Sequence, residues 1–470
     1  MYFNSYSYFL FLPIVYLSFY FSTDKYRWLV LLIASYGFYS SFNSALLPFI
    51  LAFITIVSYF CGIILGKTTH KHLVFWSGTV ACLLIMSLMK YLPFFLTYFK
   101  ADSTDVNLLV SIGVSFITFQ AISYLVDIYL ENQEPERHFG YHALSLAFFP
   151  KLLQGPIERC SDLMPQLKKS YNFDYATMRS GILLFSLGLF KKDVVANLFS
   201  LYVNMVYNDV HHYKGLTLII ATYAYAFQIF FDFSGYTDMA RGTARMFGIN
   251  LTENFNNPYA ATSIADFWRR WHISFSRWIL DYIFKPLQMY WRNFGSSGTA
   301  MALIVTFLAS GIWHGANCGF IIWGLLHGLY LAVSTYYRPY QKKLHNWLGF
   351  KKNNLLRTWQ IFVTFNLVSF SWIFFRAGSV SDAWYVVTNL LNISWQELTD
   401  ISFQINKSSK IAIFLIVAII TSILILSPKI SGRINSLLVG KKRWLFYYVF
   451  IMFILLFRRY GEGAFIYGRF

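Results

Sequence analysis

Residues 46–65 read LLPFILAFITIVSYFCGIIL and carry no charged side chain. A helix rises about 1.5 Å per residue and the apolar core of a bilayer is about 30 Å thick, so about 20 apolar residues are needed to cross it. This stretch therefore predicts a membrane-spanning helix. Comparable apolar runs lie at 6–21, 28–39, 73–99, 110–130, 182–205, 216–233, 300–313, 320–336, 359–375, 411–426 and 444–457. Together these runs predict about ten to twelve membrane crossings.

The composition also indicates a protein that lies largely within a membrane. Of the 470 residues, 57% are hydrophobic and only 13% are charged, whereas soluble domains average about 25% charged residues. This balance excludes a soluble multidomain enzyme and a disordered chain. A disulfide-stapled secreted domain is excluded as well, because the four cysteines show no CxxC spacing: Cys61, Cys82, Cys160 and Cys318.

The basic residues predict how the chain is oriented in the membrane. There are 39 Lys and Arg against 21 Asp and Glu, a formal net charge of +18. They form short clusters between apolar runs, which is typical of orientation signals and of contacts with membrane lipid, and we expect no nucleic-acid binding. Basic residues concentrate on the cytoplasmic side. An N-terminus outside the cell places every cluster there: Lys25 with Arg27, Lys67 with Lys71, residues 338–357 and residues 429–443.

Two segments in the middle of the chain differ from the apolar runs. Residues 131–179 and 232–298 contain only short apolar runs, broken by Pro and Gly. Non-helical backbone at membrane depth is tolerated where protein buries it or where it lines a cavity. We therefore predict an all-α fold and a single membrane domain over residues 1–470, with about 11 spanning helices in a ring around re-entrant and interfacial helices.

His314 is the first candidate for chemistry. It ends an apolar run in the stretch ASGIWHGAN at 309–317, and an ionisable residue in such a run is a functional-site hypothesis by default. Gly311 and Gly315 let backbone or substrate approach the ring closely. The alternative is a histidine that only hydrogen-bonds a neighbouring helix.

His272 is the second candidate and lies in DFWRRWHISFS at 266–276. Ser263 with Asp266 three residues later resembles a capping box at the start of a helix. Helical spacing from there places Trp268, His272 and Phe275 on one stripe. Without other information, packing is the favoured interpretation of such an aromatic stripe.

Charged residues beside these histidines have several possible roles. Asp266 is expected to face Arg269 and Arg270, and the sharper hypothesis for this Arg pair is a contact with anionic lipid or substrate. Asp232 and Asp238 follow an apolar run, where they are helix caps, partners of the Arg pair or orienters of a catalytic His. Capping is the commonest of these outcomes.

The other histidines are interpreted as solvated residues of polar loops: His70, His72, His138, His142, His211, His212, His327 and His345. His211 and His212 lie close to Asp209, but adjacent side chains point apart and no metal-binding spacing accompanies them. We therefore expect no metal site.

A buried neutral imidazole suits a general base near neutral pH. Such a base removes the proton of a hydroxyl as it attacks an activated acyl group, and contributes about 10²- to 10⁴-fold. No GxSxG elbow is present, and no Ser or Cys is placed to form an acyl-enzyme. Direct transfer is therefore favoured over a covalent intermediate.

Several motifs follow one another along most of the chain: MYFNS at 1–5, FFPKLLQGPI at 148–157, DFSGYTDMA at 232–240, NFNNPY at 254–259, FWRRWHISFS at 267–276, GIWHGAN at 311–317, WGLLHG at 323–328, FFR at 374–376 and FIYGRF at 465–470. In this order they resemble the membrane-bound O-acyltransferase (MBOAT) family, in its bacterial branch that modifies alginate, peptidoglycan and teichoic acid. Motifs in the right order are more specific than any one of them.

The resemblance implies acyl transfer across the bacterial cytoplasmic membrane through a central funnel. A donor, expected to be acetyl-CoA, is loaded from the cytoplasm, and no bound cofactor is expected. The acceptor is a hydroxyl of a cell-envelope polysaccharide outside, where a hydrolase-fold partner often completes the transfer. His314 matches the catalytic histidine of the family and His272 its second histidine. Substrate-contacting residues are expected among Trp313, Gly311, Gly315, Asn317, Asp232, Asp238, Trp268, Arg269, Arg270 and Trp271.

One segment departs from the family pattern. Alginate-type relatives carry Gly-Gly-Asn-Arg after the Asp-Tyr motif, whereas residues 281–292 read DYIFKPLQMYWR. Alginate is therefore not assumed as the acceptor.

Two functions from other classes compete with the enzyme. In a lipid or polysaccharide transporter, His314 would gate a pathway or relay protons, but the chain shows no internal repeat and few intramembrane carboxylates. A structural scaffold for an envelope assembly is the third hypothesis.

Overall fold

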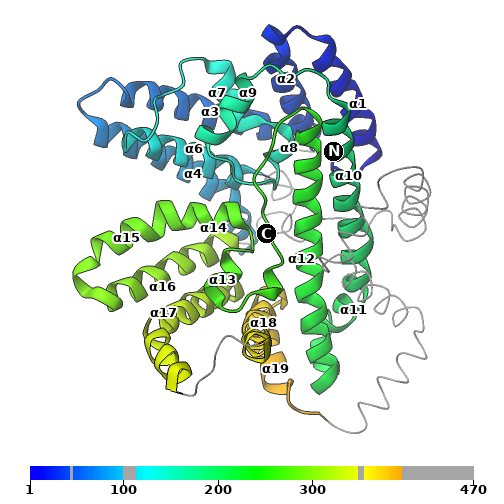
Figure 1. Cartoon of the computed structure of the whole chain (residues 1–470), viewed down its shortest axis with the longest axis vertical. Helices are drawn as coiled ribbons and strands as arrows, with labels where there is room; N and C mark the ends of the chain where they lie inside the picture. The colour runs from blue at the N-terminus through cyan, green and yellow to red at the C-terminus, as the bar shows by residue number, and fades with distance from the viewer. Residues whose placement is uncertain (43–45, 99–112, 348–353, 394–470) are drawn as a thin grey trace. The chain divides into compact units, whose positions relative to one another are not determined.

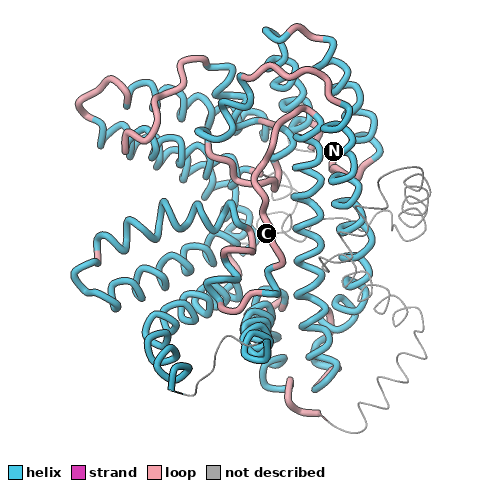
Figure 2. Tube along the Cα trace, in the orientation of Figure 1, coloured by secondary structure: helices cyan, strands magenta, loops and turns pink. Residues whose placement is uncertain are grey.

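The computed structural model describes residues 1–42, 46–98, 113–347 and 354–393, and the apolar runs at 411–426 and 444–457 lie outside them. Within these ranges the chain is helical, with one isolated β-bridge between Phe255 and Trp271 (Figures 1 and 2). This confirms the predicted all-helical class.

The helices form two compact units whose segments alternate along the chain. Unit 1 contains Met1–Gly188, Tyr236–Asn254 and His272–Ile283, and unit 2 contains Leu189–Gly235, Phe255–Trp271 and the chain from Phe284 onward.

Six helices of the described part are long and apolar enough to cross a membrane. They are α3 (Leu46–Leu65), α4 (Lys71–Tyr98), α12 (Gly215–Met246), α16 (Gly295–His314), α17 (Cys318–Trp347) and α18 (Asn354–Arg376). Two shorter apolar helices accompany them, α1 (Tyr6–Phe21) and α6 (Val114–Tyr129). Each of these helices falls on a predicted apolar run, because uninterrupted apolar sequence of this length is a local property.

Unit 1 begins with a helical hairpin. Ser5 caps α1 by accepting a hydrogen bond from the Tyr8 N–H, at 3.3 Å. After the 3₁₀ turn η1 (Asp24–Tyr26), helix α2 (Arg27–Ser40) returns. Aromatic side chains fill its core, with the buried Tyr8 ring 6.1 Å from Phe38.

The remaining elements of unit 1 are mostly short helices. They are α7 (Phe139–Ala147), α8 (Phe149–Leu152), α9 (Cys160–Lys168), α10 (Tyr175–Phe190), α14 (Ile273–Ile279) and the π-turn η5 (Leu280–Phe284). Between residues 131 and 179, the short helices confirm that no long spanning helix is present. Gly113 is required before α6, since its φ of 77° is left-handed and a Cβ would lie 2.7 Å from the Leu152 carbonyl oxygen.

Besides its long helices, unit 2 contains several short elements. They are η2 (Lys191–Ala196), α11 (Asn197–Tyr207), η3 (Val210–His212), η4 (Pro258–Ala260), α13 (Ile264–Trp268), α15 (Lys285–Tyr290), η6 (Arg292–Phe294) and α19 (Val380–Asn389). In the α16–α17 hairpin of unit 2 the two helices pack closely against each other. A Cβ on Gly324 would lie 2.4 Å from the Phe307 carbonyl oxygen, so the missing side chain lets the two helices touch.

Two sequence predictions about helix limits are wrong. The apolar run at 216–233 was expected to end near Asp232, but α12 continues to Met246. The helix expected to carry Trp268, His272 and Phe275 on one stripe breaks after α13, because His272 adopts a left-handed φ of 43° and α14 starts only at Ile273. Residues three to seven apart therefore do not share one helical face here.

Candidate active site

His314 is the last residue of α16 and is 4% exposed. Four aromatic rings surround it, from its neighbour Trp313, from Phe320 and Trp323 of α17, and from Phe375 of α18. Trp323 and Phe375 stand nearly perpendicular to the imidazole, with ring centroids 4.9 and 5.1 Å away. Three helices of unit 2 thus hold the ring in an aromatic cage.

Two buried polar groups lie beside this cage. Ser310 precedes His314 by one helical turn, so both side chains lie on the same side of α16. Within the described part of the chain, neither the Ser310 hydroxyl nor the Trp323 indole N–H has a hydrogen-bond partner. Buried polar groups are usually paired, so these two indicate a polar occupant, water or substrate, next to His314.

His327 corrects the sequence interpretation of a solvated loop residue. It is fully buried in α17, one turn after Trp323, where its Nδ1 accepts from the Trp268 indole N–H at 3.2 Å. Its Nε2 lies 2.9 Å from the Ser371 hydroxyl, which itself donates to the Val368 carbonyl oxygen. Nε2 therefore carries the proton and donates, which fixes a neutral tautomer.

Reasoning from the sequence missed this residue, although its position inside the apolar run at 320–336 is the signal that identifies it. His142 was misjudged in the same way, since it is fully buried in α7. His211 and His212 are exposed, as predicted.

The predicted substrate residue Trp268 reaches the aromatic cage. Its ring lies 5.9 Å from Trp323, and its indole N–H is held by His327. Trp271 packs in the core of unit 2 instead, with its ring stacked 5.5 Å from Phe267 and 5.2 Å from Trp372. The FWRRW motif thus contributes one tryptophan to the surroundings of His314 and one to packing.

The structure confirms the predicted cap of α13. Ser263 accepts a hydrogen bond from the Asp266 N–H at 3.1 Å. The Asp266 carboxylate pairs with Arg270 at 3.0 Å, as its i,i+4 spacing predicts. Arg269 is exposed on the surface of unit 2.

The residues that flank His314 also have structural roles. A Cβ on Gly311 would lie 2.4 Å from the Phe320 carbonyl oxygen, so the group that approaches Gly311 is the backbone of α17. Gly315 is buried and follows the end of α16. Asn317 is exposed, and its side-chain oxygen accepts from the Gly319 N–H at 2.8 Å at the start of α17.

His272 belongs to unit 1, where it is 2% exposed. Its ring stacks on Phe275 with centroids 5.1 Å apart. Burial lowers the pKa of His272 to about 3, so the imidazole is neutral at physiological pH. A left-handed backbone is uncommon for a residue other than glycine and marks a strained position.

Backbone and side-chain hydrogen bonds hold this strained turn. The Ile273 N–H donates to the Asn254 carbonyl oxygen, and the Ser274 N–H donates to the Asn254 side chain, both at 3.0 Å. The Ser274 hydroxyl accepts from the Ile157 N–H at 2.9 Å. In the described part of the chain the buried Asn254 side-chain NH₂ has no partner, so a hydrogen-bond donor is available beside the turn that begins at His272.

Asp232 and Asp238 lie inside α12 and are not helix caps, which corrects the commonest expectation for them. Asp232 forms a buried ion pair with Lys192 of η2 in unit 2. Asp238 pairs with Arg241 at 3.4 Å in unit 1, and Arg241 also lies 3.6 Å from Glu253. Each carboxylate thus has a cation nearby, and such pairing offsets the cost of a charge in an apolar helix.

Within the described residues, no group of three or more His, Cys, Asp and Glu side chains lies close enough to hold a metal ion.

The sequence matches the model of the membrane-bound O-acyltransferase family over residues 83–375. This chain belongs to the MBOAT family. It is 34% identical over 447 residues to the peptidoglycan O-acetyltransferase of Helicobacter pylori, covering 85% of this chain and 81% of that protein.

Two further relatives extend the comparison. The chain is 33% identical over 413 residues to the probable alginate O-acetylase of Pseudomonas aeruginosa, covering 84% of this chain and 75% of that protein. It is 29% identical over 319 residues to the teichoic acid D-alanyltransferase of Bacillus subtilis, covering 66% and 79%. The protein is therefore a multi-pass membrane O-acyltransferase related to polysaccharide and peptidoglycan O-acetyltransferases.

Proposed function

We propose that this MBOAT protein moves an acetyl group from a cytoplasmic donor, acetyl-CoA, across the membrane toward the hydroxyls of an extracytoplasmic cell-envelope polysaccharide, with His314 as the general base. The observation that carries the proposal is the place of His314, buried in an aromatic cage beside the unpaired Ser310 hydroxyl and Trp323 N–H. The names of the H. pylori and P. aeruginosa relatives support an acetyl group and a polysaccharide acceptor.

The chemistry requires one base and one donor to the developing oxyanion. The neutral imidazole of His314 takes the proton of the acceptor hydroxyl while its oxygen attacks the thioester carbon, a contribution of about 10²- to 10⁴-fold. The C–S bond then breaks, and the imidazolium returns its proton to the leaving thiolate. Ser310 and Trp323 are the described donors that can stabilise the negative charge on the carbonyl oxygen.

The remaining expectations form part of the same proposal. The chain is one membrane domain, in which a ring of spanning helices surrounds a central funnel. The N-terminus lies outside the bacterial cytoplasmic membrane. Gly311, Gly315, Trp313, Asn317 and Trp268 lie near His314 on this view, and a hydrolase-fold partner outside the membrane passes the acetyl group to the polymer. The residues proposed to shape the rest of the funnel are Asp232, Asp238, Arg269, Arg270 and Trp271.

The test replaces His314 with Ala and measures ester-linked acetate on envelope polymers by mass spectrometry at matched protein levels. We expect acetylation to fall by about 10²-fold or more. The matched control is His212→Ala, which removes an exposed histidine of the same unit. Unchanged acetylation in His314→Ala would refute the assignment.

For His272 we propose a supporting role in catalysis, because its ring is stacked on Phe275 and its backbone is strained. His272→Asn keeps a residue that tolerates the left-handed conformation. We expect partial loss of acetylation in this variant. Complete loss at normal stability would instead place His272 in the chemistry itself.

A further inference from the structure

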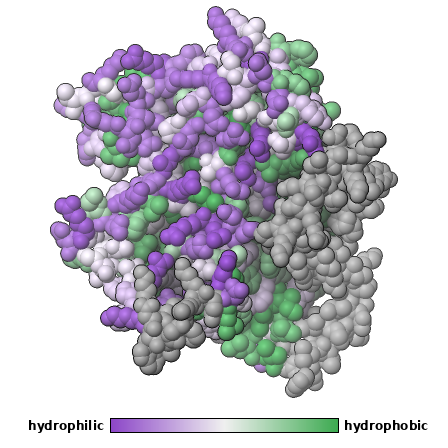
Figure 3. Space-filling model, in the orientation of Figure 1, coloured by the Kyte–Doolittle hydropathy of each residue, from purple (hydrophilic) through white to green (hydrophobic). Residues whose placement is uncertain are grey.

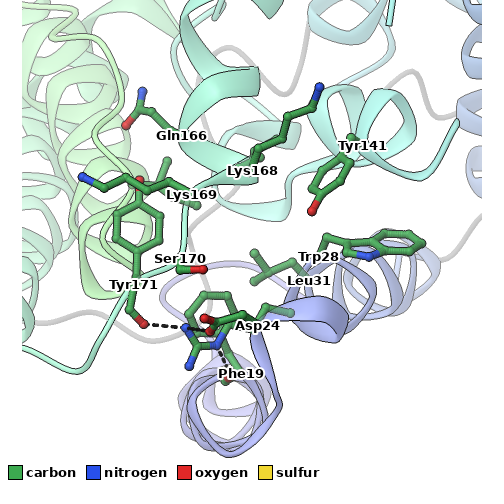
Figure 4. A pocket seen from close by; sticks show the side chains of 13 residues that line it. Phe19, Asp24, Trp28, Leu31, Tyr141, Gln166, Lys168, Lys169, Ser170 and Tyr171 are labelled. Carbon is green, nitrogen blue, oxygen red and sulfur yellow. Dashed lines mark hydrogen bonds and ion pairs between the residues drawn. The ribbon is translucent and has the colours of Figure 1, made fainter. Parts of the chain in front are cut away.

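A small pocket of unit 1 lies where the α1–α2 hairpin meets the chain after α9 (Figure 4). We call it the hairpin pocket, and its lining includes Arg27, Trp28, Tyr141, Lys168, Lys169 and Tyr171. Its enclosed part measures about 20 Å³, which is room for one water-sized group. A larger ligand group would therefore sit at the mouth and place one atom inside.

The charged side chains that line the pocket are mostly cationic. Arg27, Lys168 and Lys169 stand against a single carboxylate, Asp24. Arg27 neutralises Asp24 at 2.6 Å and also donates to the Phe19 carbonyl oxygen at 3.2 Å, so it builds the pocket wall. Lys168 is in turn paired with Glu136, so Lys169 is left to give the mouth its net positive charge.

The two lysines flank the mouth from different sides. In Figure 4 the Lys169 amino group points toward Tyr171 and away from that of Lys168. Lys168 pairs with Glu136, whereas Lys169 has no carboxylate within ion-pair distance in the described part of the chain. Lysine has a flexible four-carbon stem, so both amino groups can turn to an anion held at the mouth.

The surface beside this mouth has the composition of a membrane–water interface. The turn between two apolar helices, α1 and α2, ends at Arg27. Next to it, Phe21 is 86% and Phe173 is 57% exposed, and the Phe173 ring contacts Tyr20 at 5.9 Å. Figure 3 shows hydrophobic side chains beside hydrophilic ones over α1 and α2. Aromatic and basic residues together are typical of the membrane–water interface.

We propose that the hairpin pocket binds the phosphate of an anionic phospholipid headgroup, with the acyl chains lying along the exposed apolar side chains of α1. A phosphodiester matches the cationic mouth, and its attached acyl chains match surfaces such as Leu17 and Phe21, which a free phosphate would leave uncovered. Trp28 and Tyr141 also line the pocket, and tryptophan and tyrosine are the residues typical of headgroup depth. This lipid site is separate from the chemistry proposed at His314.

The test is native mass spectrometry of the purified full-length protein in mild detergent with equimolar dioleoyl phosphatidylglycerol and dioleoyl phosphatidylcholine. We expect the protein to retain phosphatidylglycerol preferentially. The double variant Lys168→Gln/Lys169→Gln should bind it at least fivefold more weakly, since each interfacial lysine contributes about 1 kcal/mol, or about fivefold. The matched control is Lys67→Gln/Lys71→Gln, which also removes two lysines, both outside the pocket and one of them paired with Glu131 as Lys168 is with Glu136.

Two competition experiments distinguish a lipid headgroup from other phosphate-containing ligands. Inorganic phosphate and coenzyme A, each added in excess, should leave the retained phosphatidylglycerol unchanged, and displacement by either would overturn the lipid assignment. If the double variant melts at a lower temperature than the wild type, the exposed single variant Lys169→Glu replaces it. If a folded lysine variant retains as much phosphatidylglycerol as the wild type, the lipid proposal is overturned. This result does not depend on whether the same protein acetylates polymer.

Discussion

Ser310 and His314 lie one turn apart on α16, yet the loss of each side chain has a different expected cost. The imidazole packs against four rings, so its removal changes packing as well as chemistry. The Ser310 hydroxyl is buried without a described partner. An unpaired buried hydroxyl costs free energy in the folded protein and persists only where something outweighs this cost.

We therefore predict that Ser310→Ala separates stability from activity. Removing the unpaired hydroxyl should leave the melting temperature of the purified protein unchanged or raise it. Loss of an oxyanion donor should lower polymer acetylation by about tenfold or more. Thermal unfolding and mass spectrometry of the polymer measure the two effects. Full activity would show that the hydroxyl only fills space.

His142 permits a prediction about pH. It lies outside the spanning helices, its Nε2 is 2.9 Å from the Ser58 hydroxyl, and burial lowers its pKa from the usual value of about 6.5 to about 3. Below about pH 6.5 this histidine is protonated in the unfolded chain but stays neutral in the folded chain. The free energy of unfolding therefore decreases as the pH falls, by about 1.4 kcal/mol per pH unit. Above that pH this histidine has no such effect.

His142→Phe should therefore make the detergent-solubilised protein less sensitive to acid. The measurement compares the drop in apparent melting temperature between pH 7.5 and 5.5 in wild type and variant. His272 keeps its own sensitivity, since its pKa is lowered too, so the drop should shrink and not vanish. An equal drop in both proteins would contradict the prediction.

At the scale of the helix, the apolar pattern of α12 does not reveal which residue pairs with its buried carboxylate. The sequence places a carboxylate at Asp232, and a buried charge in an apolar helix is costly unless it is paired. Lys192, forty residues earlier, supplies the pairing cation. A short window of sequence does not contain such a distant partner, so it does not show where a helix like α12 ends. It does show the limits of α1 and α3, because no buried charge interrupts these helices.

The ion pair leads to a double-mutant prediction. Lys192→Met takes the paired cation from the buried Asp232 and should lower the unfolding free energy by about 3–5 kcal/mol. Lys192→Met with Asp232→Asn removes the buried charge as well and should recover much of that loss. Melting of the purified proteins tests this. Equal melting of the single and double variants would show that the pair contributes no coupling.

The α16–α17 hairpin links a backbone contact to the place of His314. A Cβ at Gly324 would meet Phe307 at 2.4 Å and Gly311 at 3.1 Å, so Gly324→Ala must push the helices apart. We expect a loss of about 1–3 kcal/mol, as for other overpacked sites, together with lower acetylation.

The matched control is Gly37→Ala in α2, where a Cβ meets nothing within 4 Å. Alanine has the higher helix propensity, so this variant should be as stable as the wild type or more stable. Melting and acetylation of both variants are measured side by side. If Gly324→Ala behaves like Gly37→Ala, the hairpin contact does not position His314.

For the whole molecule, the sequence predicted the membrane class and the spanning runs of the described helices, because these depend on local composition and short motifs. The catalytic roles of His314 and His272 stay predictions. The sequence did not predict the break at His272, whose conformation depends on hydrogen bonds to Asn254, nor the burial of His327, whose partners Trp268 and Ser371 are far away in sequence. Long-range pairing is the information that a single sequence lacks.

Two contacts between segments far apart in sequence lead to a prediction of how unit 1 is oriented in the membrane. Trp28, after the α1–α2 turn, lies 5.0 Å from His138. Lys71, at the start of α4, pairs with Glu131 after α6, at 2.5 Å. These contacts bring the first two basic clusters and the chain after α6 to one end of unit 1. Since basic residues concentrate on the cytoplasmic side, that end should face the cytoplasm.

Cysteine labelling tests this orientation in spheroplasts of cells that make the Cys318→Ser protein, which lacks the exposed native thiol. A membrane-impermeant maleimide should label Ser41→Cys, beyond the far end of α2, without permeabilisation. It should label Thr69→Cys, between α3 and α4, only after the membrane is opened, since both positions are exposed and differ only in side. The reverse pattern would place the N-terminus in the cytoplasm and move the hairpin pocket to the outer leaflet.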